Sequence, residues 1–211
     1  MSDRPGRLYV ITAPSGAGKT SLVRALMEKE PGLGFSISCT TRPRRPNEVH
    51  GRDYFFVSPD DFARLVEVGE FLEHAQVFDH RYGTPRAQVE QALAAGRSLI
   101  LEIDWQGARQ VRAAMPECVS VFILPPSRAE LERRLHGRGT DGEDVVQRRL
   151  RDAAGDMSHW AEFDHVVVND EFAKAVDELR AIVQNRGEAS RRERPGLAAL
   201  AAGLVGAATT P

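Results

Sequence analysis

The sequence is short of cysteine and of clustered metal ligands. It has 2 cysteines among 211 residues, Cys39 and Cys118, and they do not form a CxxC pair. The 6 histidines are scattered, and none has the spacing of a metal site. We therefore expect reduced, partly buried thiols rather than a redox pair, and histidines with structural roles.

A charge excess and a long hydrophobic run are also missing. The chain has 28 basic and 30 acidic residues, a net charge of −2, so it lacks the positive field that drives binding to nucleic acids. No apolar stretch is long enough to span a membrane, and no signal peptide is evident. The composition, 42% hydrophobic, predicts a cytoplasmic globular protein with no nucleic-acid or membrane partner.

The most informative segment is APSGAGKT, residues 13–20, which follows the apolar run 8–11 and precedes an expected helix over 21–29. A strand, a glycine-rich turn and Lys-Thr form a loop that binds nucleoside triphosphates. Gly16 and Gly18 let the backbone wrap phosphate oxygens, Lys19 reaches the β- and γ-phosphates, and the Thr20 hydroxyl is a candidate Mg²⁺ ligand. Ala13 replaces the usual first glycine, so that position must accept a residue with a Cβ atom.

A second anion site is predicted in TTRPRRPNEVHGRDYFFV, residues 40–57. Pro43 and Pro46 prevent a continuous helix, so the guanidinium groups of Arg42, Arg44 and Arg45 project from an extended segment. Such groups can bind a dianion in bidentate fashion. The alternative is a solvated basic loop or a nucleic-acid patch, which the balanced net charge disfavours.

These two segments resemble the bacterial guanylate kinases, P-loop nucleoside monophosphate kinases that move the γ-phosphate of ATP onto GMP. The resemblance spans residues 5–186, and Ala13 also fits the pattern of this family. Its most specific element is a signature that this sequence matches at every defined position: Thr40, Thr41, Arg42, Arg45, Glu48, Gly51, Tyr54 and Phe56.

The resemblance implies ATP and GMP as substrates, Mg²⁺ as cofactor, and three sets of residues. The implied ATP contacts are Ala13, Pro14, Ser15, Gly16, Ala17, Gly18, Lys19, Thr20, Arg134, Arg138 and Asn169. The implied GMP contacts are Ser38, Arg42, Arg45, Tyr54 and Tyr82, which hold the GMP phosphate, together with Glu73, Thr84 and Asp104. The implied catalytic residues are Lys19, Arg42, Arg134, Arg138 and Arg149.

Glu73 is the implied reader of the guanine base. A carboxylate accepts hydrogen bonds from the N1 and N2 protons of guanine, whereas adenine presents an unprotonated N1 to the same oxygens. The Thr84 hydroxyl would add a contact to the base edge. Thr84 also has the pattern of an N-cap, with Pro85 at the first position of a helix that reaches Ala95.

Glu102 and Asp104 follow the apolar run 98–103, at the carboxyl end of an expected parallel strand, where doubly wound sheets bind ligands. Alternation points both carboxylates the same way. We expect Asp104 to contact nucleotide and Glu102 to order the water shell of Mg²⁺. The alternative is that Asp104 caps a helix over 106–115.

A mobile lid is expected over 127–157. Ser127 and Glu130 form a capping box that opens an arginine-rich helix, followed by the glycine-containing HGRGTDGED. Transfer between two polyanions requires positive charge and exclusion of water, and Arg134, Arg138 and Arg149 match the lid arginines of the family. Arg133 and Arg148 lie on other helix faces and are expected at the surface. Asn169, in HVVVND, matches the wall beside adenine.

Alternating strands and helices predict an α/β fold, a three-layer sandwich of the P-loop NTPase type with a mainly parallel sheet. The expected core comprises residues 5–35, 91–126 and 158–186. A GMP-binding lobe over 36–90 and the lid over 127–157 are inserted into it. The tail, 187–211, is rich in small residues and is expected to be disordered. Alternatively LAALAAGLV could form a helix against a second subunit, which leaves a homo-oligomer open.

Two other functions fit part of the pattern. Guanylate-kinase-like modules that have lost catalysis bind phosphopeptides, but they lack the intact loop that Gly18, Lys19 and Thr20 preserve here. A kinase of another phosphorylated acceptor, such as a ribose bisphosphate, would not need Glu73 or the complete signature.

Overall fold

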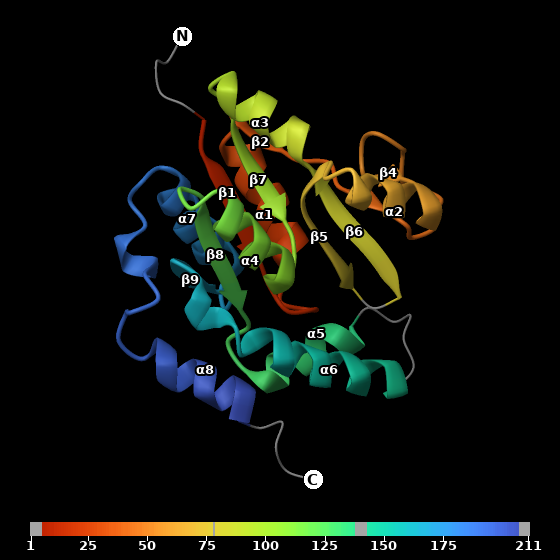
Figure 1. Ribbon diagram of the computed structural model, residues 1–211. Helices are drawn as coiled ribbons and strands as arrows, with labels where there is room; N and C mark the ends of the chain where they lie inside the picture. The colour runs from red at the N-terminus through yellow and green to blue at the C-terminus, as the bar shows by residue number, and fades with distance from the viewer. Residues whose placement is uncertain (1–5, 78, 138–142, 207–211) are drawn as a thin grey trace. The chain divides into compact units, whose positions relative to one another are not determined.

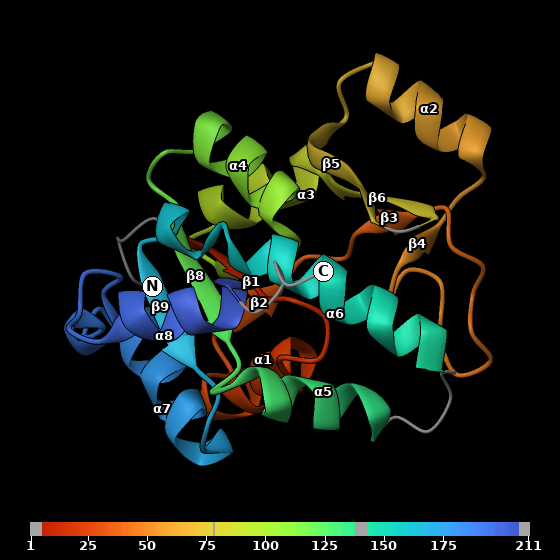
Figure 2. The ribbon, with the colours of Figure 1, turned by 90° about the horizontal axis from the view of Figure 1, so that it is seen from below.

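A computed structural model describes residues 6–77, 79–137 and 143–206, and this part of the chain divides into two units. The first unit comprises Gly32–Cys118 together with the chain up to Val10. The second comprises Ile11–Pro31 together with the chain after Cys118. Figure 1 labels the α-helices and all strands except β3, which Figure 2 labels. The predicted division into core, GMP-binding lobe and lid stays a prediction; residues 36–90 and 91–118 lie in the same unit.

The main sheet has five strands in the order β2-β7-β1-β8-β9. β2 pairs in parallel with β7, and β8 pairs in parallel with β9. β1 is buried throughout and reads as a continuous apolar run, as expected for a parallel strand covered on both faces. The expected α/β fold is confirmed. The bounds of these strands are β1 Leu8–Thr12, β2 Leu33–Phe35, β7 Ser98–Glu102, β8 Val119–Leu124 and β9 His165–Val168.

The first unit also contains a smaller mixed sheet in the order β4-β3-β6-β5. β3 is parallel to β4 and antiparallel to β6, and β6 is antiparallel to β5. Phe62 of the helix α2 packs on Phe71 of β5, with ring centroids 4.7 Å apart, and anchors that helix. The bounds are β3 Cys39–Thr40, β4 Phe55–Phe56, α2 Pro59–Glu67, β5 Phe71–Val77 and β6 His80–Pro85.

Two further helices complete the first unit, α3 (Arg86–Ala94) and α4 (Trp105–Ala114). α3 packs on β7, and α4 lies along β5, as Figures 1 and 2 show from two directions. Both predicted thiols belong to this unit. Cys39 and Cys118 are buried and are not joined in a disulfide, and burial raises the pKa of the Cys39 thiol to about 11.

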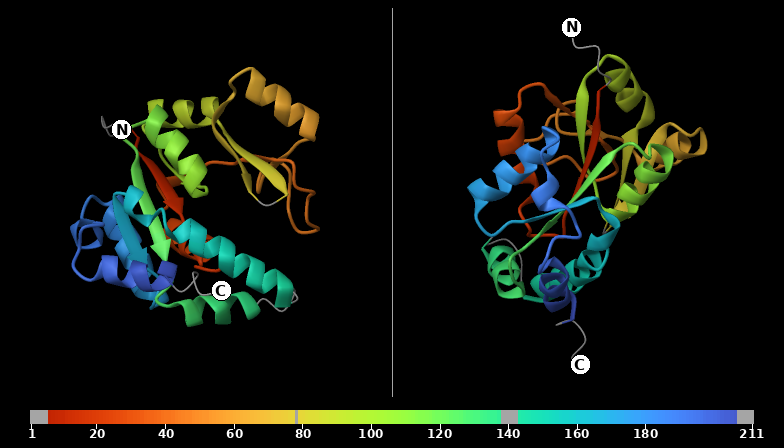
Figure 3. Two further views of the ribbon diagram at one scale, coloured as in Figure 1. Left: turned by 60° about the horizontal axis from the view of Figure 1, so that its bottom comes forward. Right: turned by 90° about the vertical axis from the view of Figure 1, so that its left-hand side faces the viewer.

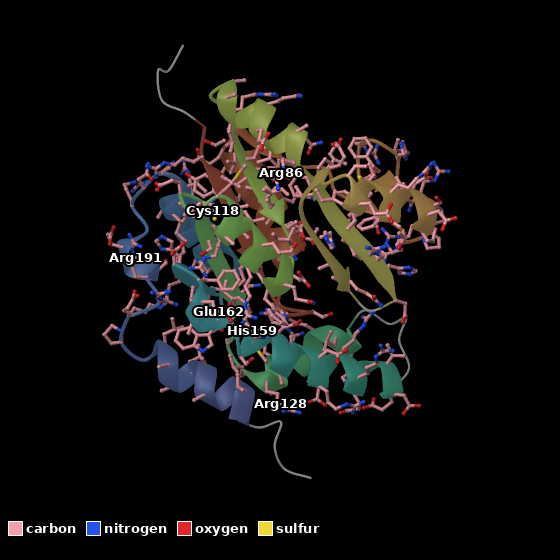
Figure 4. The ribbon with its side chains drawn as sticks, viewed as in Figure 1. Arg86, Cys118, Arg128, His159, Glu162 and Arg191 are labelled. Carbon is pink, nitrogen blue, oxygen red and sulfur yellow. The ribbon has the colours of Figure 1, made fainter. Side chains whose placement is uncertain are left out.

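In the second unit, α1 packs against α7, and α5 packs against α6. α5 begins at the cap Ser127, whose hydroxyl accepts from the backbone N–H of Glu130 at 3.1 Å. His159 precedes a 3₁₀ turn whose last residue is Glu162, and His159 Nδ1 lies 2.7 Å from Glu162 Oε1 (Figure 4). The bounds are α1 Lys19–Lys29, α5 Arg128–His136, α6 Glu143–Met157, η1 Trp160–Glu162, α7 Phe172–Val183, η2 Glu188–Ser190 and α8 Leu197–Gly206.

The tail as far as Gly206 is ordered, contrary to the predicted disorder. Arg191, labelled in Figure 4, forms an isolated antiparallel bridge with His165 of β9. α8 then packs on α6 (Figure 3, right). Leu197, Ala201 and Leu204 of α8 are buried. These three apolar side chains have helical spacing and form a buried face of α8, which composition alone does not reveal. Among the described residues, no helix is long and apolar enough to cross a membrane.

Candidate functional site

The phosphate loop connects β1 to α1 in the second unit. Gly16 and Gly18 have φ angles of 88° and 92°, a region that favours glycine, and Gly18 caps the start of α1. Ala13 needs no such conformation, because Asn185 is the single non-glycine residue with positive φ in the described part of the chain. The loop therefore accepts alanine at its first position. The backbone N–H groups at the start of α1 provide the positive end at which phosphate binds.

Asn169, which directly follows β9, is bonded to this loop. Its side-chain amide donates to the carbonyl oxygen of Ala17 at 2.8 Å, and the residue is 5% exposed. A Cβ atom on Gly18 would lie 2.6 Å from Asn169 Nδ2. The predicted place of Asn169 beside adenine stays a prediction, and its amide nitrogen is bonded to the loop. Gly18 is thus required both for its φ angle and for this close approach.

Arg134 of α5 continues this network of hydrogen bonds. Its Nη2 donates to the carbonyl oxygen of Asn169 at 2.9 Å, and its Nε donates to Glu130 Oε1 at 2.7 Å. The third nitrogen, Nη1, is buried and has no hydrogen-bond partner among the described residues. A guanidinium donor held in place without an acceptor is suited to an anion, since each of its N–H groups otherwise stays unsatisfied.

Glu130 holds two neighbouring arginines, and the hydrogen bonds from Arg133 and then Arg134 lower the pKa of its carboxyl to about 2. The Arg133 and Arg148 side chains are 73% and 59% exposed, which confirms their surface positions. Arg149 is half-buried on α6. Arg138 lies outside the described residues.

Arg42 forms one end of a polar cluster in the first unit. Its Nη2 donates to Glu48 Oε1 at 2.6 Å, and its guanidinium carbon lies 5.4 Å from the ring centroid of Tyr54. The Tyr54 and Tyr82 rings meet edge to face at 6.1 Å. Burial raises the pKa of the Tyr54 hydroxyl, and the nearby charge of Glu102 raises it further. The structure thus assembles three of the predicted phosphate ligands, Arg42, Tyr54 and Tyr82.

Ser38 and Arg45 flank this cluster in different ways. Ser38 is half-buried just before β3, and its carbonyl accepts from the backbone N–H of Phe55 at 2.9 Å. Arg45 is exposed, and its backbone N–H donates to Glu48 Oε2 at 2.9 Å. Glu48 therefore binds at both Arg42 and Arg45 and orders the turn between them.

Glu73 is buried on β5, with 3% of the residue exposed. Its Oε1 accepts a hydrogen bond from the Thr84 hydroxyl at 2.6 Å, and the two residues are paired across β5 and β6. Thr84 is consequently not the N-cap of α3. That position falls on Pro85, which makes no side-chain cap, and α3 begins at Arg86.

Asp104 caps α4, as the alternative interpretation proposed. Its Oδ1 accepts from the Gly107 backbone N–H at 2.8 Å, and Oδ2 accepts from Gln106 at 3.2 Å. Glu102 is the last residue of β7, and its negative charge raises the pKa of the Tyr54 hydroxyl. The two carboxylates do not share a strand, because β7 ends before Asp104. Among the described residues, no three His, Cys, Asp or Glu side chains form a metal-binding group.

Comparison with known proteins decides the family. Residues 5–186 match the guanylate kinase family model. The chain is 56% identical over 201 residues to a guanylate kinase of Methylococcus capsulatus, covering 95% of this chain and 98% of that one. It is 54% identical over 202 residues to a guanylate kinase of Chromohalobacter salexigens, covering 96% and 92%. This chain belongs to the guanylate kinase family.

The fold agrees with this family. The crystal structure of guanylate kinase from Anaplasma phagocytophilum matches with a TM-score of 0.73 at 34% identity, covering 95% of each chain. Membership of the guanylate kinase family accounts for the intact phosphate loop and for the complete Thr-Thr-Arg signature. A binding module without catalysis would require neither.

Sequence reasoning missed several residues that support the site. Glu48 was recognised only as a signature residue, although it fixes Arg42. Glu130 was recognised only as a helix cap, although it holds Arg134. Gly107 and Gln110, on α4, carried no signal, because their partners lie on a strand more than thirty residues away.

Proposed function

We propose that this protein transfers the γ-phosphate of ATP to GMP, giving ADP and GDP. The observation that carries the proposal is the buried Glu73 carboxylate, held by Thr84 in the same unit as the cluster of Arg42, Tyr54 and Tyr82. A base-reading carboxylate and a phosphate-binding cluster together suit a nucleoside monophosphate. The family membership of the chain supports GMP as that nucleotide.

The donor phosphates are assigned to the loop of residues 13–20. Backbone N–H groups would cradle the β-phosphate, and Lys19 would reach the β- and γ-phosphates. The buried Nη1 of Arg134, for which the described part of the chain offers no acceptor, supports an anion beside this loop. Arg138 and Arg149 are predicted to add positive charge as the γ-phosphate moves.

The reaction needs no general base. The attacking group is a phosphate oxygen of GMP, already anionic at neutral pH, so the residues must align two phosphates and neutralise their charge. Arg42 is suited to this task because the acceptor phosphate can compete with Glu48 for the same guanidinium.

The donor set at the loop fits Mg²⁺. Thr20 lies in the first turn of α1, where a hydroxyl can serve as a single protein ligand while phosphate oxygens and water complete the shell. Mg²⁺ would supply positive charge that offsets the negative charge of the transferred phosphate. Glu102 is predicted to order the water shell of this ion.

A coupled ADP-release assay with ATP and Mg²⁺ tests the function, with GMP, AMP, CMP, UMP and a sugar phosphate as parallel acceptors. We expect turnover with GMP alone. Glu73→Gln should raise KM for GMP by roughly 10- to 100-fold, since a neutral amide cannot accept from both guanine donors. Turnover of another acceptor in preference to GMP would refute the assignment. Silence with every acceptor from folded protein would favour a phosphopeptide-binding module.

A further inference from the structure

β5 is an edge strand of the small sheet, and its outer edge is bonded by a side chain. Gln110 of α4 makes two hydrogen bonds to the backbone of His74: the His74 N–H donates to Oε1 at 3.0 Å, and Nε2 donates to the His74 carbonyl at 2.7 Å. The side-chain amide thus replaces the peptide group that a neighbouring strand would present. Both distances are those of good hydrogen bonds.

This clamp lies next to Glu73 at an irregular point of the ladder. The pairing of β5 with β6 shifts register between Phe71 and Glu73. A bulge weakens the control that ladder hydrogen bonds exert over side-chain direction. The ladder is therefore irregular just before Glu73, and the Gln110 clamp holds the backbone immediately after it.

The same helix face also contacts the Glu73 carboxylate. Gly107 lies one turn before Gln110, and a Cβ atom at Gly107 would be 2.4 Å from Glu73 Oε2 and 3.0 Å from its Cδ. The carboxylate therefore packs against the first turn of α4, whose positive end favours a negative charge. The helix α4 thus contacts the Glu73 carboxylate at Gly107 and holds the adjacent His74 backbone through Gln110.

We propose that Gln110 is a positioning residue for base recognition, holding Glu73 where it accepts from both guanine donors. The inference rests on the proposed function, in which Glu73 reads guanine. Two simultaneous hydrogen bonds to one carboxylate demand a fixed position, whereas a single bond tolerates displacement. Inosine monophosphate keeps the N1 proton but lacks the N2 amino group, so the preference for GMP over it reports the second bond.

Gln110→Met tests this role, because it keeps the side-chain length and removes both hydrogen bonds. We expect kcat/KM for GMP to fall about 10- to 100-fold through KM, as small misplacements of a binding group do. The loss for inosine monophosphate should be several-fold smaller, and KM for ATP should not change. Equal losses for both acceptors, or no loss for GMP, would overturn the proposal.

Gln88 offers a matched control in the same unit. Its Oε1 accepts from the Ser36 hydroxyl at 2.6 Å and from the Ile37 N–H at 2.8 Å, so it also clamps a distant backbone. That segment leads to Ser38, at the predicted phosphate end, so Gln88→Met should affect GMP and inosine monophosphate equally. If Gln88→Met lowers the GMP preference as much as Gln110→Met, the effect is general loosening and the proposal fails.

Two further variants separate this inference from the function beneath it. If the wild type does not use GMP, or Glu73→Gln keeps the full preference over inosine monophosphate, the base-reading role is wrong. If both behave as expected and Gln110→Met retains the preference, the positioning role alone is wrong. Gln110→Met in the Glu73→Gln background should lower the preference no further, since the two act as one unit. Should Gln110→Met not fold, Gln110→Glu replaces it, because it keeps the acceptor for the His74 N–H and loses the donor to the His74 carbonyl. It should lower the GMP preference in the same direction by a smaller factor, and an unchanged preference would overturn the proposal.

Discussion

The phosphate loop predicts that Gly18→Ala is costly in two separate ways. The φ angle of 92° lies in the left-handed region, where a residue with a Cβ atom costs about 1 to 2 kcal/mol. The added Cβ would also lie 2.6 Å from Asn169 Nδ2, which donates to the Ala17 carbonyl. Losing that hydrogen bond costs a further ~0.5 to 1.5 kcal/mol.

The sum, about 2.5 kcal/mol, should lower the free energy of unfolding and reduce Tm by roughly 5 to 10 °C in a chain of this size. KM for ATP should rise, because the loop backbone moves, while KM for GMP should change little. Thermal unfolding and steady-state kinetics with each substrate varied measure these effects.

Gly155→Ala is the matched control, since a Cβ there meets nothing within 4 Å on the exposed face of α6. It should be neutral or stabilise by up to about 1 kcal/mol, as alanine is the better helix former. In an Asn169→Ala background, Gly18→Ala should cost less, because the close contact is gone. A Gly18→Ala protein as stable as the wild type, with unchanged KM for ATP, would refute the reasoning.

Two more predictions follow from the second unit. Glu130→Gln should raise KM for ATP severalfold by releasing Arg134. Because the pKa of the Glu130 carboxyl is lowered to about 2, the stability that the ionised carboxylate contributes is present above about pH 4.5 and is lost as pH falls toward 2. Urea unfolding of both proteins across that range should therefore converge at low pH, and a constant difference would contradict the assigned pKa. Leu204→Ala should cost ~2 to 3 kcal/mol of unfolding free energy by opening a cavity between α8 and α6, whereas Ala202→Ser, on the exposed face, should stay within about 0.5 kcal/mol. Equal stability of these two variants would mean that α8 does not pack in solution.

Local patterns predicted many elements well. The cap Ser127 opens α5, the apolar run 8–11 lies in β1, and the run 98–103 contains β7. These signals succeed because a cap or an apolar run acts within a few residues. Thr84 shows the limit of such signals. Its local pattern is that of a helix cap, but β6 continues through Pro85, and the Thr84 hydroxyl donates to Glu73 instead.

The tail shows a second limit. Its small residues predict disorder when the segment is considered alone, because they bury little area. The helix α8 is nevertheless described as far as Gly206, since α6 supplies the apolar partner for Leu197, Ala201 and Leu204. Composition measures what a segment can bury by itself and carries no information about the surface that receives it.

The sequence by itself determined the chemistry of this protein: the phosphate loop, the arginine signature and the carboxylate at Glu73 are contiguous or closely spaced, so their roles can be recognised without a fold. Only the tertiary structure decided which groups hold them in place. Asn169 reaches the loop across 152 residues, and Gln110 reaches His74 across 36. Such bonds join segments that meet only after the chain has folded, so no local spacing or periodicity records them.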